Sequence, residues 1–113
     1  MADSVTLARF GSVDVVRMVG EVDMSTVPGI ERTVVPPLRS ATAAVVDLTA
    51  VGFLDSAGVR LLDTLVGDLE RREARVALVV PPVGEVRMAL QLCAFREDLL
   101  QPDLTAARAA VAG

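Results

Sequence analysis

The segment Asp55-Ser56-Ala57-Gly58 places a carboxylate, a hydroxyl and a glycine where the hydrophobic pattern changes from a continuous apolar run to helical spacing. We therefore expect a loop to lead from a buried strand into a helix that begins within two residues of Ser56. The free amides and partial positive charge of a helix N-terminus stabilise anions, so an anionic group on Ser56 would be favourably placed. The alternative is that Ser56 serves only as the N-cap, its hydroxyl accepting from a nearby amide.

The composition argues against most other chemistry. The chain has no histidine, the commonest general base and metal ligand. It also has no glycine-rich phosphate loop, and no carboxylate pair at a known catalytic spacing, so we expect no enzyme activity, no metal and no cofactor. The net charge is −4, all 11 basic residues are arginines, and only Arg71, Arg72 and Arg75 cluster. Without a concentrated basic surface or many aromatic residues, nucleic acid is not an expected partner.

The length and hydropathy predict one domain, which we assign to residues 1–113. The hydrophobic fraction is 52%, enough for a single core. No apolar run approaches the ~20 residues that span a bilayer, and the first residues do not resemble a signal peptide. We expect a cytoplasmic protein with no membrane insertion. The single cysteine, Cys93, is expected to be a buried, inert thiol rather than a redox sensor.

The elements that must position Ser56 follow from an alternation of strand and helix patterns. Valine-rich runs at 4–10 and 13–19, separated by Gly11-Ser12, predict an antiparallel hairpin. Later strands are expected at 43–48, 75–80 and around 99–100, and helices near 27–35, 56–72, 86–93 and 104–111. This order predicts an α/β domain with a mixed sheet of four or five strands, parallel after the hairpin and covered by about four helices.

The first helix carries mixed signals. Ser25-Thr26 followed by Pro28 is typical of a helix start, and Val27, Ile30 and Val34 would form its buried face. Pro36-Pro37 should end or distort the helix, because proline lacks an amide donor and disfavours helical geometry in the preceding residue.

Two motifs at matching separation resemble those of STAS domains of bacterial anti-sigma factor antagonists. The first is Gly-Glu-Val-Asp at 20–23; the second comprises Asp-Leu-Thr at 47–49 and Phe-Leu-Asp-Ser-Ala-Gly-Val at 53–59. The resemblance covers nearly the whole chain and implies a STAS-like fold. It also implies a non-enzymatic switch that sequesters a serine-kinase anti-sigma factor, which would use its own ATP to phosphorylate Ser56 and turn binding off. A phosphatase would reset the switch.

The resemblance also assigns a partner-binding face. Asp23 and Asp55 match acidic positions that flank the phosphoacceptor. Ala57 stands where many relatives have a second hydroxyl, and Ala94 where relatives often have glycine. The residues assigned to partner binding are Asp23, Thr49, Leu54, Asp55, Ser56, Ala57, Gly58 and Arg60.

Several of these residues have a structural alternative. Asp55 and Asp23 could each serve only to cap a helix. Arg60, with Thr64 and Arg71, faces away from the core stripe and forms either a solvated surface or a partner surface. Of the neighbouring apolar pair, we expect Phe53 in the core, whereas Leu54 is either core or presented to a partner.

Two other functional classes share features with this sequence. A response-regulator receiver needs an acidic pair after its first strand and a lysine near its end, but Phe10-Gly11-Ser12 follows the first strand and the chain has no lysine. The stronger rival keeps the fold and changes the role to a non-phosphorylated STAS scaffold subunit, for example of a transport ATPase. The intact Asp-Ser pair and the Gly-Glu-Val-Asp loop favour the switch.

Overall fold

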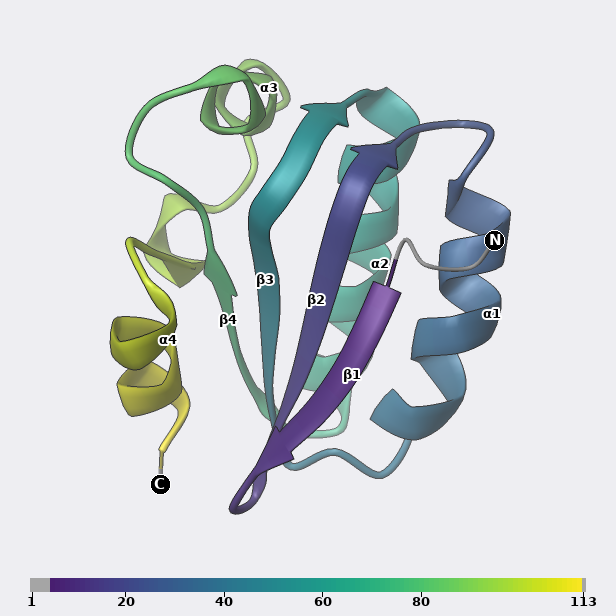
Figure 1. The fold of residues 1–113 in the computed structure, drawn as a ribbon. Coiled ribbons are helices and arrows are strands. Elements are labelled where there is room, and N and C mark those ends of the chain that lie inside the picture. The colour runs from purple at the N-terminus through teal and green to yellow at the C-terminus, as the bar shows by residue number, and fades with distance from the viewer. Residues whose placement is uncertain (1–4, 113) are drawn as a thin grey trace.

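The structure is a computed structural model that describes residues 5–112. Five strands form one sheet in the order β1-β2-β3-β4-β5 (Figure 1). Their bounds are Val5–Phe10, Val13–Val22, Ala43–Leu54, Arg75–Val79 and Leu100–Gln101. β1 pairs antiparallel with β2, and every later pair is parallel. The predicted mixed sheet with an N-terminal hairpin is confirmed, although Ser4, where we expected the first strand to begin, lies outside the described residues.

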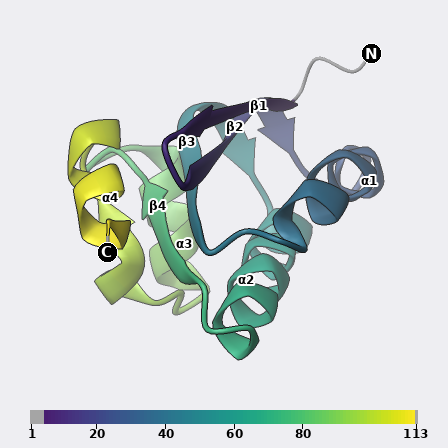
Figure 2. The same cartoon turned by 90° about the horizontal axis from the view of Figure 1, so that it is seen from below.

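Four α-helices cover the sheet: α1 (Val27–Leu38), α2 (Ser56–Arg71), α3 (Glu85–Leu92) and α4 (Leu104–Val111). Helices α1, α2 and α3 contribute to the larger hydrophobic core on one face, whereas α4 packs over a smaller core on the other (Figure 2). A short 3₁₀ helix, Glu97–Leu99, precedes β5. Within residues 5–112, none of the helices has both the length and the apolar character needed to cross a bilayer.

Helix α1 starts where predicted and runs through its two prolines. Ile30 and Val34 are buried as expected, and Leu38 extends this face by one turn. Pro36 and Pro37 lie in the last turn, and the helix ends at the next residue. Their missing amides therefore limit the helix without breaking it earlier.

Strand β3 is longer than predicted, and this difference positions the candidate site. We expected the strand to end at Leu48 and a loop to follow, but β3 continues to Leu54 beside the end of β2. Irregular register between residues 17 and 21 of β2 lets the two strands stay paired to their ends, where Val22 lies opposite Leu54. The two motifs of the sequence, 20–23 and 53–59, therefore lie next to each other.

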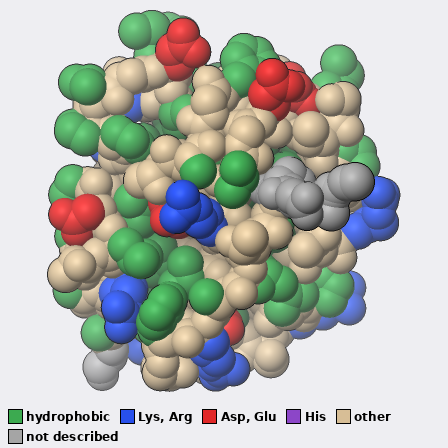
Figure 3. All heavy atoms as spheres, viewed as in Figure 1, with side chains coloured by type: hydrophobic (Ala, Val, Ile, Leu, Met, Phe, Trp, Pro, Cys, Tyr) green, Lys and Arg blue, Asp and Glu red, His purple; other side chains and the backbone are tan. Residues whose placement is uncertain are grey.

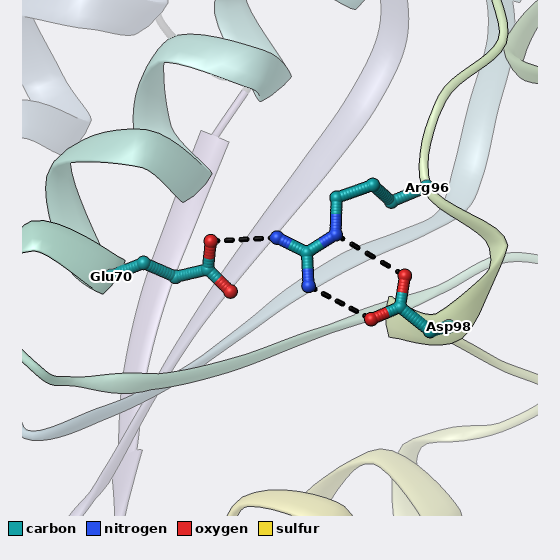
Figure 4. A network of polar contacts seen from close by, with 3 residues as sticks. All are labelled: Glu70, Arg96 and Asp98. Atoms are coloured by element: carbon teal, nitrogen blue, oxygen red, sulfur yellow. Dashed lines mark hydrogen bonds and ion pairs between the residues drawn. The ribbon is translucent and has the colours of Figure 1, made fainter.

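An ion-pair network holds the end of α2 to the segment before β5 (Figure 4). Arg96 donates to both carboxylate oxygens of Asp98, at 3.2 and 2.8 Å, and to Glu70 Oε1 at 2.6 Å. These hydrogen bonds raise the pKa of Arg96, and the bonds from Arg96 lower the pKa of Asp98. The chain enters this segment through Ala94, whose φ of 56° is a left-handed conformation that favours glycine.

The prediction for Cys93 was wrong, because the residue is exposed. Helix α3 ends at Leu92, and its buried residues are Val86 and Leu90. Cys93 follows the helix as its C-cap, where the chain begins to turn toward Ala94, so the apolar stripe does not continue to it.

Candidate functional site

The side chain of Asp55 joins the loop after β2 to the start of α2. Its Oδ1 accepts a hydrogen bond from the Gly58 amide at 3.0 Å, and its Oδ2 accepts from the Met24 amide at 3.2 Å. Its own amide donates to the carbonyl of Val22 at 3.3 Å. One residue therefore caps the helix and fixes the loop carrying the Gly-Glu-Val-Asp motif.

Asp55, not Ser56, is the N-cap of α2. Ser56 is the first residue of the helix and is exposed. Within residues 5–112 its hydroxyl has no hydrogen-bond partner, so the alternative that Ser56 serves only as a cap is wrong. A nucleophilic oxygen is left accessible at the N-terminal end of a 16-residue helix.

Gly58 is needed for the close packing of this helix on the sheet. A Cβ atom here would lie 2.5 Å from the carbonyl oxygen of Val22 and 2.5 Å from Leu54 Cδ1. Gly58 and Leu54 are both buried, and Leu54 is only 5% exposed. The option that Leu54 is presented to a partner was therefore wrong, and Gly58 lies beneath the proposed binding face.

Asp23 folds the loop that leads into α1. Its Oδ1 accepts from the Ser25 hydroxyl at 2.8 Å and from the amides of Ser25 and Thr26 at 2.9 and 3.1 Å. The Ser25 hydroxyl bond, supported by the amide bonds, lowers the pKa of Asp23, so the carboxylate is ionised at neutral pH. The N-cap of α1 is Thr26, which makes no side-chain capping bond, so Asp23 orders the turn before the helix rather than capping the helix itself. Its half-buried side chain contributes negative charge at this edge.

The remaining predicted residues lie at different depths. Arg60 is exposed one turn after Ser56, and Ala57 is half-buried. Thr49 is exposed on β3, and its hydroxyl donates to Asp47 Oδ1 at 2.7 Å. Asp47 is only 5% exposed, and beyond its place in the Asp-Leu-Thr motif no role for it was predicted.

Sequence reasoning missed the exposed apolar side chains around this edge. Met24 is 77% exposed, Val83 79% and Phe53 46%, so the expectation of Phe53 in the core was wrong. Successive side chains of a strand point to opposite faces of the sheet, so predicting this segment as strand rather than loop would have placed Phe53 and Leu54 on opposite faces. Acidic side chains also lie along this upper edge (Figure 3). Met and aromatic residues are enriched at protein interfaces, so the exposed Met24 and Phe53 are suited to contact a partner protein.

The chain is similar to a known domain family and to several solved structures. The sequence model of the STAS domain family matches residues 4–109. The crystal structure of an anti-sigma factor antagonist from Mycobacterium paratuberculosis is 30% identical, with a TM-score of 0.87 over 95% of this chain and 92% of that one. No match was found among curated proteins.

Two structures of SpoIIAA share the fold at lower identity. The unphosphorylated form of this anti-sigma factor antagonist is 23% identical, with a TM-score of 0.72, covering 86% of this chain and 85% of that one. The phosphorylated form, from Bacillus, is 23% identical with a TM-score of 0.67, covering 86% and 88%. Together with the family match over almost the whole length, the mixed sheet and its four helices establish that this chain belongs to the STAS domain family.

Proposed function

We propose that this protein is a non-enzymatic anti-sigma factor antagonist whose partner binding is turned off by phosphorylation of Ser56. The partner is a serine kinase that also acts as an anti-sigma factor and brings its own ATP, and a phosphatase reverses the modification. The observation that carries the proposal is the exposed Ser56 hydroxyl, without a hydrogen-bond partner in the described chain, at the start of α2. The likeness to the mycobacterial antagonist supports the general role.

The surroundings of Ser56 suit a phosphate group. Asp55 uses the amide of Gly58, which leaves the first-turn amides of Ser56 and Ala57 without an intrahelical acceptor. These amides and the helix dipole favour an anion. Because Ser56 is exposed and outside the core, phosphorylation should leave the fold nearly unchanged.

The effect of phosphate should fall on the interface. It adds about −1.5 to −2 charges next to Asp55 and near the ionised Asp23, and it occupies space on the docking face. A close contact replaced by an acidic group should cost about 2 to 5 kcal/mol in binding, or roughly 30-fold to several thousand-fold in affinity. Modification would therefore release the partner.

The test combines phosphorylation with affinity measurements. The protein is incubated with the candidate kinase from the same organism and ATP, and the phosphate is located by mass spectrometry. Ser56→Ala should bind the kinase and remain unmodified, and Ser56→Asp should bind weakly while melting close to the unmodified protein. Thr64→Ala removes another exposed hydroxyl of α2 and should change neither property.

Two results would contradict the proposal. Phosphate on Thr49 or Thr64 would place the acceptor elsewhere. Equal affinity of the unmodified, Ser56→Ala and Ser56→Asp proteins would favour the non-phosphorylated scaffold role, in which the same helix face binds a subunit of another complex such as a transport ATPase.

A further inference from the structure

A second surface lies at the opposite end of α2, between the C-terminal ends of α1 and α2. Figure 2 views the molecule from this end and shows the two helices side by side. A hollow of about 360 Å³ lies between the two helices, and a shallower, more open depression of about 500 Å³ adjoins it on α1 alone; the two share Val35 and Arg39. We call them together the arginine groove; its charged residues are Glu31, Arg32, Arg39, Asp68, Arg71 and Arg72.

The arginine groove is positive on a protein that is negative overall. Four arginines and two carboxylates line it, whereas the whole chain has a net charge of −4. Asp68 is already paired with Arg71. Neither Arg32 nor Arg39 has an ion-pair partner among residues 5–112, so the groove has unneutralised positive charge.

Arg72 holds the groove in shape. Its guanidinium donates to the carbonyls of Leu38 and Arg39, at 2.8 and 2.7 Å, and so ties the end of α1 to the end of α2. A cation at the C-terminal end of a helix is stabilised by the dipole, which accounts for Arg71 and Arg72. It does not account for the hollow between the helices or for the unpaired Arg32.

The floor of the groove is apolar. Leu38, Leu65 and Leu69 line its base with small exposed fractions, and Val35 is half-buried at the junction of the two hollows. A nucleic acid would use charge and aromatic stacking, but no aromatic residue lines either hollow. An aliphatic side chain of a partner would pack on this apolar floor, and carboxylates on either side of it would pair with the arginines around the groove.

We propose that the arginine groove binds an acidic segment of a partner protein that inserts an aliphatic side chain between α1 and α2. This surface is separate from Ser56, because at 1.5 Å per residue Ser56 lies about 14 Å from Leu65 and about 22 Å from Arg71 along the axis of α2. The proposal does not depend on phosphorylation, and a partner could occupy the groove while the other end of α2 is in use.

The test is an NMR titration of the whole protein with a short peptide in which leucines are spaced by pairs of glutamates. We expect saturable shifts at residues of the arginine groove, with weaker binding at higher salt because ionic contacts are screened. Arg39→Gln/Arg71→Gln should reduce the affinity at least about tenfold. Arg9→Gln/Arg17→Gln removes the same charge from the hairpin and should bind as the unmodified protein does. Arg72 is left in place, and thermal melting checks that each variant is folded.

Control ligands decide the chemistry of the occupant. Peptides with lysine in place of glutamate, or serine in place of leucine, should bind much more weakly. No saturation at millimolar peptide, shifts centred on Ser56, or equal affinity of the Arg39→Gln/Arg71→Gln protein would overturn the proposal. Tighter binding of a thymidine oligonucleotide through the same arginines would overturn the acidic peptide as occupant. Because Ser56 is unchanged throughout, failure here would leave the proposed switch untouched.

Discussion

Replacing Gly58 with alanine tests whether the start of α2 is held against the sheet as closely as the structure indicates. The added methyl would meet the Val22 carbonyl oxygen and Leu54 Cδ1, each at 2.5 Å. A rotation of Leu54 can relieve one contact, but the backbone oxygen can move only if strand and helix separate. Overpacking of this kind costs about 1 to 3 kcal/mol, and alanine returns up to about 1 kcal/mol through helix propensity.

Because one of the contacts is with backbone, we expect an overpacking cost near the upper end of that range, about 3 kcal/mol. After the gain of about 1 kcal/mol from helix propensity, Gly58→Ala should lower the free energy of unfolding by about 2 kcal/mol. With an unfolding entropy of about 2.1 cal/mol/K per residue, this corresponds to a melting temperature roughly 8 °C lower. Thermal and urea unfolding followed by circular dichroism would measure both values.

Gly67 is a matched control on the same helix. Its nearest neighbour would be Arg71 Nη1 at 3.4 Å, the far end of a flexible side chain. Gly67→Ala should therefore stabilise the protein by about 0.5 to 1 kcal/mol. If both substitutions stabilise the protein equally, the close approach of α2 to β2 is not a rigid constraint and the reasoning fails.

Three further predictions follow from single residues. Ala94→Gly should raise the free energy of unfolding by about 0.5 to 1 kcal/mol, because alanine is strained at a φ of 56°; a lower melting temperature would contradict this. The lowered pKa of Asp23 contributes stability above the ordinary aspartate pKa of about 3.9, and this contribution is lost as the pH falls through the lowered pKa. The melting temperature of Asp23→Asn should therefore fall less on acidification than that of the unmodified protein, and parallel curves would refute the assignment. Cys93 is exposed, so a thiol reagent should label it stoichiometrically without denaturant; labelling only after unfolding would contradict the structure.

The order of elements was predictable because hydrophobic period is a local property of the sequence. The stripe of α2 and the continuous apolar run at the start of β3 each identify their element without knowledge of its neighbours. The predicted order of strands and helices along the chain and the helix start near Ser56 follow directly from these patterns.

Burial near element ends was less predictable, because it depends on pairing that the sequence does not display. β3 continues past Leu48 only because the irregular end of β2 stays beside it, and this pairing decides that Phe53 is exposed and Leu54 buried. The capping role of Asp55 was one of two alternatives, since both Asp55 and Ser56 are good N-cap residues and only the backbone geometry separates them. Cys93 fits a helical stripe whose helix stops one residue earlier.

The two carboxylate oxygens of Asp55 accept hydrogen bonds from different segments, one from an amide of α2 and the other from an amide of the loop after β2. A partner that contacts Met24 and Ser56 together thus meets a surface whose two halves are already fixed relative to each other, and it loses little conformational entropy in ordering them. Asp55→Asn exchanges one acceptor oxygen for an amide that cannot accept. Such a protein would keep the Ser56 hydroxyl but would bind its partner more slowly. The loop after β2 and the start of α2 would no longer be held together, so they would have to adopt the binding conformation during each encounter.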